Sequence, residues 1–221
     1  MNPSKIVRIQ SPKLPKQLST KVIQALENNS EYSSVMISGC TLSRQNAENV
    51  LLEQAHLRRV IFNETNIKKF RLFDSRIEDS DFSGAKWEQA RFQRVEFIGC
   101  RFLGIQLMEA EIENTLFKEC IFDHAMILSA DISSVLFEKC NLQSISIEST
   151  KLSETGFYNC DLTNAIFGGT KLSGIDLRGS IINRMQIDPQ AMQGAIIDPS
   201  QALQVVGLLG VIIRENDEAS T

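Results

Sequence analysis

Residues 80–104 read SDFSG AKWEQ ARFQR VEFIG CRFLG, which is five consecutive units of five residues. The third residue of every unit is aromatic, and the first is Ser, Ala, Ala, Val or Cys. A helix repeats every 3.6 residues and a strand every two, so a period of five indicates a repeat architecture of its own.

This register extends far beyond the quoted stretch. From Tyr32 to Ile187 the third position occurs 32 times, and only Ala47 is not a large apolar residue. Two residues earlier in the unit, 26 of 32 residues are Ala, Ser, Thr, Cys or Val. We therefore expect each unit to bury one small and one large side chain and to expose the other three, with no loop insertions between units.

The cysteines indicate how many units make one coil. All five stand in the small column, and their separations are 20 residues or a multiple of 20. Four units per coil would place them above one another on one wall. At about 4.8 Å per coil, eight coils would form a barrel roughly 38 Å long. The residues singled out as structural core are Cys100, Cys120, Cys140, Cys160, Phe102 and Phe122.

Several units match a known consensus. Ser80-Asp81-Phe82-Ser83-Gly84 and Cys160-Asp161-Leu162-Thr163-Asn164 resemble the repeat of the pentapeptide-repeat family. The resemblance implies a right-handed quadrilateral β-helix. The fold class predicted is an all-β solenoid of about eight coils with small helical caps at both ends.

The two ends of a solenoid must be covered, because they would otherwise expose core and strand edges. At the N-terminus we expect a strand over Lys5–Ile9 and a helix that Ser19 caps and that runs to Glu27. At the C-terminus, Asp198 and Pro199 are favourable N-cap and N1 residues for a helix, which a strand over 211–213 would follow. The predicted organisation is 1–29 N-terminal cap, 30–197 β-helix, 198–214 C-terminal cap and 215–221 flexible tail.

The C-terminal cap holds more apolar residues than one barrel end needs, and its strand would be an unpaired edge. A two-fold dimer would cover both. The quinolone-resistance branch of the family ends in a similar helix and strand that pair two monomers. The alternative is that the segment folds back over its own barrel. The predicted dimer interface is Leu203, Val206, Leu209, Val211 and Ile213.

Nothing in the sequence indicates catalysis, a cofactor or a metal. His56 and His124 are expected to point outward on different walls, without a nucleophile beside them. An inward column of cysteines does not converge as a tetrahedral metal site requires. The carboxylates fall at solvent-facing positions, and we predict that the protein is not an enzyme.

Composition restricts partners and compartment. The net charge of −4 argues against direct binding of nucleic acid, which needs an excess of Lys and Arg. We see no apolar run that would span a membrane and no secretory signal, so no membrane association is expected. Five cysteines in a regular packing column favour the cytoplasm over a disulfide-forming compartment.

Charge is distributed unevenly along the barrel. Residues 30–106 hold 11 Lys or Arg and 10 Asp or Glu, whereas residues 107–198 hold 6 and 13. Some family members engage DNA gyrase and topoisomerase IV and are proposed to imitate DNA, so the resemblance implies a type II topoisomerase as a possible partner. Seven net negative charges over roughly 22 Å of barrel are about half the density of duplex DNA or less.

Outward-facing apolar residues give a competing signal, because Met108 should stack under Leu128 with Met126 nearby, and Leu116 under Leu136 on the neighbouring wall. The alternative function is a protein-binding scaffold of unknown partner that uses this mid-barrel patch. The candidate partner-binding residues are Met108, Met126, Leu128, Glu109, Glu111, Glu113, Asp131 and Glu148.

Overall fold

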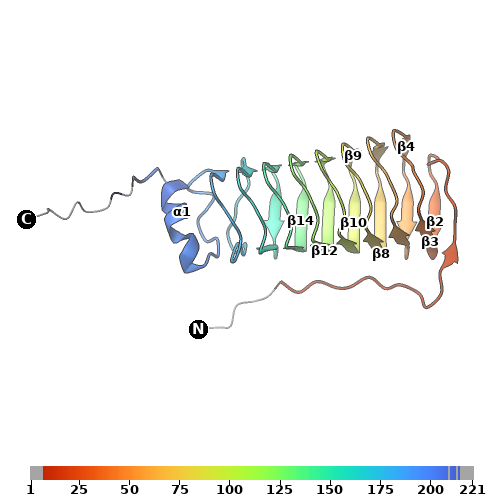
Figure 1. The fold of residues 1–221 in the computed structure, drawn as a ribbon, viewed down its shortest axis with the longest axis horizontal. Coiled ribbons are helices and arrows are strands. Elements are labelled where there is room, and N and C mark those ends of the chain that lie inside the picture. Colours follow the sequence, from red (N-terminus) through yellow and green to blue (C-terminus); the bar gives the residue numbers. More distant parts are fainter. Residues whose placement is uncertain (1–6, 209, 213, 215–221) are drawn as a thin grey trace, which may run out of the picture.

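The computed structural model describes residues 7–208, 210–212 and 214. The chain forms a parallel β-solenoid whose coils lie side by side along one axis (Figure 1). Each residue pairs with the residue 20 positions later, as Phe92 does with Ile112 and Ile112 with Ile132. The predicted solenoid with four units per coil and an unbroken register is confirmed.

Each coil passes through four walls, which we number from the first large apolar residue of each. Wall 1 begins with Tyr32, wall 2 with Ile37, wall 3 with Leu42 and wall 4 with Ala47, and each recurs every 20 residues. Within a unit the first and third side chains point into the barrel and the fifth lies at the corner before the next wall.

Walls 1 and 2 belong to one sheet, and wall 4 forms another. The first sheet has 11 strands: β1 (Ser19–Thr20), β2 (Glu31–Ser33), β3 (Val35–Ser38), β5 (Leu51–Glu53), β6 (His56–Arg58), β8 (Arg71–Glu78), β10 (Arg91–Ile98), β12 (Glu111–Lys118), β14 (Asp131–Glu138), β16 (Lys151–Ser153) and β17 (Gly156–Tyr158). The second has eight: β4 (Asn46–Glu48), β7 (Asn66–Lys68), β9 (Lys86–Glu88), β11 (Gln106–Met108), β13 (Met126–Leu128), β15 (Ser146–Glu148), β18 (Ile166–Phe167) and β19 (Gln186–Ile187). Wall 3 is held by single bridges, such as Arg101 to Ile121.

The corners share one backbone conformation. The fifth residue of the unit takes a left-handed φ where it is glycine, as at Gly99 (62°), and also where it is not, as at Asn49 (59°) and Lys139 (53°). The left-handed conformation costs an L-residue roughly 1–2 kcal/mol, and glycine avoids this cost. Because non-glycine residues adopt it at most corners, the pairing between coils must determine the corner conformation.

The barrel interior is filled by stacked aromatic rings and small side chains. The ring of Phe102 lies 5.0 Å from that of Phe82 and 4.4 Å from that of Phe122, measured between centroids, and all three are buried. Their burial excludes water from the barrel and supplies the main stabilisation of each coil. The predicted core residues Phe102 and Phe122 are confirmed as buried.

The predicted cysteine column also lies in the core. The four thiols of the column are free and buried, and each points to main-chain oxygens of its own and the previous coil: Cys100, Cys120, Cys140 and Cys160. Burial raises the pKa of the Cys120 thiol, which keeps it in the neutral form that this apolar column can hold.

The predicted N-terminal helix over Ser19–Glu27 is wrong. Ser19 and Thr20 instead form β1, which pairs with β3 and extends the first sheet. The open edge of the first coil presents unpaired main-chain groups, and an extended chain satisfies them where a helix would not. Ile23 and Leu26 are buried over this end of the barrel.

Residues 7–18, which we call the arm, run back beside the coils from the first coil toward the other end (Figure 1). The described part of the predicted strand over 5–9, residues 7–9, is in no strand, and residues 5 and 6 lie outside the described residues.

The C-terminal helix is confirmed. It consists of a 3-10 turn, η1 (Pro199–Gln201), and α1 (Ala202–Leu208). Asp198 is the N-cap, and its side chain accepts from the main-chain N–H groups of Ser200 and Gln201 while Gln201 completes a capping box. In contrast, the strand predicted over 211–213 is absent at Val211 and Ile212, which have no neighbouring strand edge in a single chain. Residue 213 and the tail 215–221 lie outside the described residues.

Phe102→Ala should lower the free energy of unfolding by about 3–5 kcal/mol, because it leaves a cavity between two stacked rings. The neighbouring Leu103 is 37% exposed, so Leu103→Ala is the matched control and should change stability by less than about 0.5 kcal/mol. Urea unfolding followed by circular dichroism measures both. Equal losses for the two variants would contradict the assignment of inward and outward positions.

Candidate functional site

The candidate partner-binding residues lie together on one side of the barrel. Met108, Met126, Leu128 and Glu148 are on wall 4, in β11, β13 and β15. Glu111, Glu113 and Asp131 are on wall 1, in β12 and β14, and Glu109 stands at the corner between the two walls. Walls 4 and 1 are adjacent along the chain, so these residues share one side of the barrel.

The apolar part of the surface is small and continuous. Strand pairing places Met108 beside Leu128, and Met126 is in the same strand as Leu128. Met126 is 37% exposed, and Met108 and Leu128 are partly exposed. Three outward-facing apolar side chains on neighbouring strand positions form a surface whose coverage by a partner would be favourable.

Leu116 and Leu136 also stack, but they do not extend this patch. They are paired across β12 and β14 on wall 2, which is the wall opposite wall 4. The prediction that they lie on the neighbouring wall is therefore wrong. Four walls per coil bring units to adjacent walls when they are 5 residues apart, whereas Met108 and Leu116 belong to units 10 residues apart.

The acidic part of the surface is partly neutralised by its neighbours. Glu111 accepts a hydrogen bond from Arg91 at 2.7 Å, and Asp131 pairs with Lys151 at 3.0 Å. Both carboxylates remain at least half exposed, so these pairs contribute little to stability and can exchange partners. The column of Glu111 and Asp131 is thus bounded by a basic residue at each end, whereas Glu109 and Glu113, on either side of Glu111, accept from Gln89 and Gln93. These four carboxylates form the acidic row.

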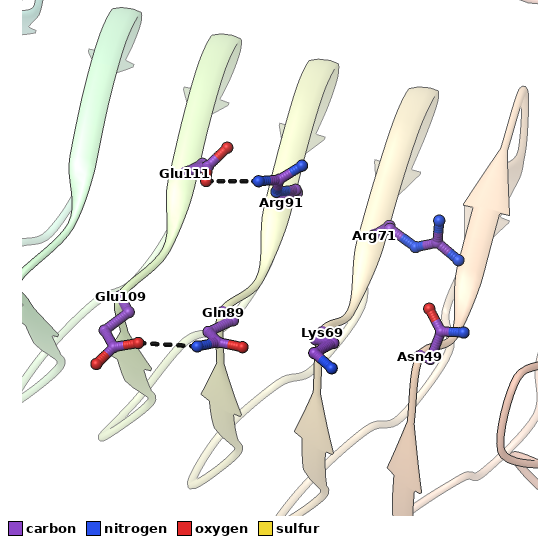
Figure 2. Close-up of a pocket in the computed structure, with 7 residues that line it drawn as sticks. All are labelled: Asn49, Lys69, Arg71, Gln89, Arg91, Glu109 and Glu111. Atoms are coloured by element: carbon purple, nitrogen blue, oxygen red, sulfur yellow. Dashed lines mark hydrogen bonds and ion pairs between the residues drawn. The ribbon is translucent and has the colours of Figure 1, made fainter.

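A groove that the sequence did not reveal adjoins this row. Its volume is about 590 Å³, and Figure 2 shows its lining of Asn49, Lys69, Arg71, Gln89, Arg91, Glu109 and Glu111. Lys69, Arg71 and Arg91 make one end basic, and Glu109 and Glu111 make the other acidic. Residues 20 apart occupy it in two columns, and that spacing was the signal that could have located it.

Arg71 is the least satisfied residue of the groove. Its closest carboxylate in the described structure is that of Glu31, at 3.9 Å, and its buried Nε has no acceptor there. Lys69 pairs with Glu48 at 3.3 Å. The surface therefore changes from basic to acidic along the barrel axis, with the apolar patch beside the acidic end.

The two histidines lie apart from each other and are not part of the candidate surface. His56 Nε2 lies 3.3 Å from Glu78 Oε2 on wall 2, and His124 is exposed at the corner after wall 3, so the two histidines are on different walls as predicted. Among the described residues, no His, Cys, Asp or Glu side chains gather in a group of three or more that could hold a metal ion. No helix in the described parts of the chain has the length and apolar character to cross a membrane.

Comparison with known proteins identifies the repeat. Residues 90–167 match the family model described as a pentapeptide repeat region. This part of the chain is a pentapeptide-repeat region. The same register continues on both sides of the match, and the predicted resemblance to pentapeptide-repeat proteins is confirmed.

Several solved pentapeptide-repeat structures are similar to the chain. A trypsin-treated variant of QnrB1, a plasmid-mediated fluoroquinolone resistance protein, is 15% identical, with 84% of this chain and 100% of that chain covered and a TM-score of 0.49. HetL, which is involved in heterocyst differentiation regulation in the cyanobacterium Nostoc, is 14% identical, with 72% and 87% covered and a TM-score of 0.20. Rfr23 from the cyanobacterium Cyanothece is 15% identical, with 62% and 91% covered and a TM-score of 0.18. No curated protein sequence matches the chain.

Proposed function

We propose that this pentapeptide-repeat protein is a non-catalytic binding protein that holds a partner protein against walls 4 and 1. The observation that carries the proposal is the exposed apolar patch of Met108, Met126 and Leu128 beside the carboxylates of Glu109, Glu111 and Asp131. Such a combination fits a partner surface with an apolar centre and Lys or Arg around it.

The rigidity of the barrel supports a binding role. Every residue of the patch stands on a strand or corner that is paired to the coil before and the coil after it. The surface is therefore pre-organised, and little conformational entropy is lost when a partner binds.

The most concrete partner is a type II topoisomerase. What supports it is the excess of 13 Asp or Glu over 6 Lys or Arg in residues 107–198, because an enzyme that binds DNA presents basic surface. QnrB1, one of the similar structures, is a fluoroquinolone resistance protein. We further place the protein in the cytoplasm, where its five free thiols would stay reduced.

A partner other than a topoisomerase is the second candidate. The observation that favours it is the pairing of Glu111 with Arg91 and of Asp131 with Lys151. These pairs reduce the net negative charge of the acidic row, so the apolar patch would contribute more of the binding free energy. In this case walls 4 and 1 bind a protein that the sequence does not identify.

We also propose a homodimer through the C-terminal cap. Leu203 is 68% exposed, Val211 54% and Ile212 77%, and Val206 is partly exposed. A contiguous apolar end of this kind is covered when two copies meet about a two-fold axis. Leu209 and Ile213, which belong to the predicted interface, lie outside the described residues.

DNA gyrase supercoiling with and without a fluoroquinolone tests the topoisomerase proposal. Micromolar wild-type protein should inhibit supercoiling or protect it from the drug. Met126→Lys should weaken the effect by about tenfold or more, because it places a charge in the centre of the patch. Leu103→Lys, with the same 37% exposure on wall 3, is the matched control and should act like the wild type.

If the wild-type protein has no effect in this assay, the proposal of a topoisomerase partner is refuted. The second candidate, another partner protein, then remains. Equal activity of Met126→Lys and wild type would refute the assignment of the binding surface to wall 4.

Light scattering after size-exclusion chromatography tests the dimer. The wild-type chain should elute with twice the monomer mass of 24.8 kDa, and Leu203→Asp should elute as a monomer. Val22→Asp is a control at the opposite end of the barrel, since Val22 is 77% exposed and should not affect association. A monomeric wild type would contradict the proposal.

A further inference from the structure

The arm, residues 7–18, is held to the barrel in an unusual way. No hydrogen bond joins its main chain to that of the barrel within the described residues, until Ser19 N–H donates to the Ser34 carbonyl. Two side chains at the corner between walls 1 and 2 hold it instead. Asp74 accepts from the Lys13 N–H at 3.0 Å, and Asn114 accepts from the Gln10 N–H at 3.2 Å.

These two acceptors are built into the barrel. Asp74 and Asn114 are each only 7% exposed, whereas the corner residues Asp79 and Glu119 after wall 2 are exposed. Arg94, from the coil between them, donates to both carboxylate oxygens of Asp74 at 2.6 Å. Arg94 and the Lys13 N–H lower the pKa of Asp74 against the effect of its burial, so it remains a charged acceptor at neutral pH.

The spacing of the acceptors matches an extended chain. Asp74 and Asn114 are two coils apart, which is about 9.6 Å at the usual interstrand distance. Gln10 and Lys13 are three residues apart, which is roughly 9.3 Å in a polyproline II conformation. An extended segment along the barrel axis thus brings every third N–H group into register with every second coil.

The same step continues at the far end of the arm. Three residues before Gln10, Val7 lies over Gly156, which is about two coils beyond Asn114. A Cβ on Gly156 would come within 3.2 Å of Val7 Cγ2 and within 2.6 Å of the Tyr158 ring in the same strand, so glycine leaves room for both side chains. The arm meets the barrel at residues 7, 10 and 13. Its two prolines, Pro12 and Pro15, lie between or after these positions, so their lack of an N–H group costs no hydrogen bond to the barrel.

Side-chain burial along the arm follows one pattern. Val7, Ile9, Pro12 and Leu14 are partly buried, whereas Arg8, Lys13 and Lys16 are exposed. The corner therefore receives apolar side chains and prolines from a segment whose basic side chains face solvent.

We propose that this corner is a docking groove for an extended, proline-containing segment of a partner protein with apolar side chains turned toward the barrel, and that the arm is its tethered competitor. Asp74, Asn114 and Gly156 form the groove, and the arm shows the chemistry that it accepts. Because the arm is attached to the barrel, its effective concentration is in the millimolar range and masks the groove from weak ligands. The groove lies at the edge that wall 1 shares with wall 2, where the Asn114 side chain donates to Glu113 at 3.0 Å, and its test measures binding of the arm rather than the function proposed above.

The test uses the full chain and a fluorescent peptide of residues 7–18 as the probe, with binding measured by fluorescence anisotropy. Gln10→Pro with Lys13→Pro removes both N–H donors and should release the arm. The released variant should bind the probe about tenfold or more tightly than the wild type does. Ser11→Pro is the matched control, because it adds a proline to the arm and keeps both donors, and it should bind like the wild type.

Two further measurements make the result decisive. Trypsin should cleave after Arg8 and Lys16 faster in the released variant than in the wild type. Asn114→Ala in the released variant should weaken binding of the probe by about fivefold or more, since it removes one acceptor. A released variant that fails to bind the probe, or in which trypsin cleavage is unchanged, would overturn the proposal. An equal gain with Ser11→Pro, or no effect of Asn114→Ala, would do the same.

Discussion

Main-chain pairing between residues 20 positions apart is the constraint on which the rest of the structure depends. It fixes which side chain of each unit enters the barrel and forces the left-handed corner even on residues such as Lys139. Because every coil repeats the one before it, a side chain stacks on its equivalent, as Phe117 does on Phe97 and Phe137 at 5.0 and 4.9 Å between ring centroids. A single physical rule thus defines the core and leaves three side chains of each unit free to vary.

The proposed binding surfaces therefore lie where the outward residues depart from a solvated polar surface. Wall 4 replaces its outward polar residues with Met108, Met126 and Leu128, and the adjoining wall 1 carries the acidic row. On the other side of wall 1, the corner between walls 1 and 2 replaces exposed residues with the buried Asp74 and Asn114. The two regions meet on wall 1, where the Asn114 side chain donates to Glu113 at 3.0 Å, so the two proposed partners would bind side by side.

The sequence was sufficient for the coil length and for the inward positions, although Leu116 and Leu136 were assigned to the wrong wall. The barrel, its cysteine column and the buried Phe102 and Phe122 follow from the register alone. The N-terminus could not be predicted in this way. Ser19 and Thr20 form a strand instead of the predicted helix, because they pair with the open edge of the first coil. Pairing beyond the repeat was also hidden, since the contact between Gln10 and Asn114 joins residues 104 positions apart. The groove beside Arg71 arises from columns that become visible only once the coil length is fixed.

Urea unfolding of two insertion variants tests the 20-residue constraint most directly. One variant carries a second copy of residues 111–130 after Ala130, and the other carries one additional Ser at the same place. The first should fold with one more coil and keep or raise the midpoint of unfolding, because every residue still stacks on its equivalent. The second should lose the cooperative transition, because all units after the insertion are out of register with those before it. Wild-type stability of the single-residue variant, or failure of the 20-residue variant to fold, would contradict the account.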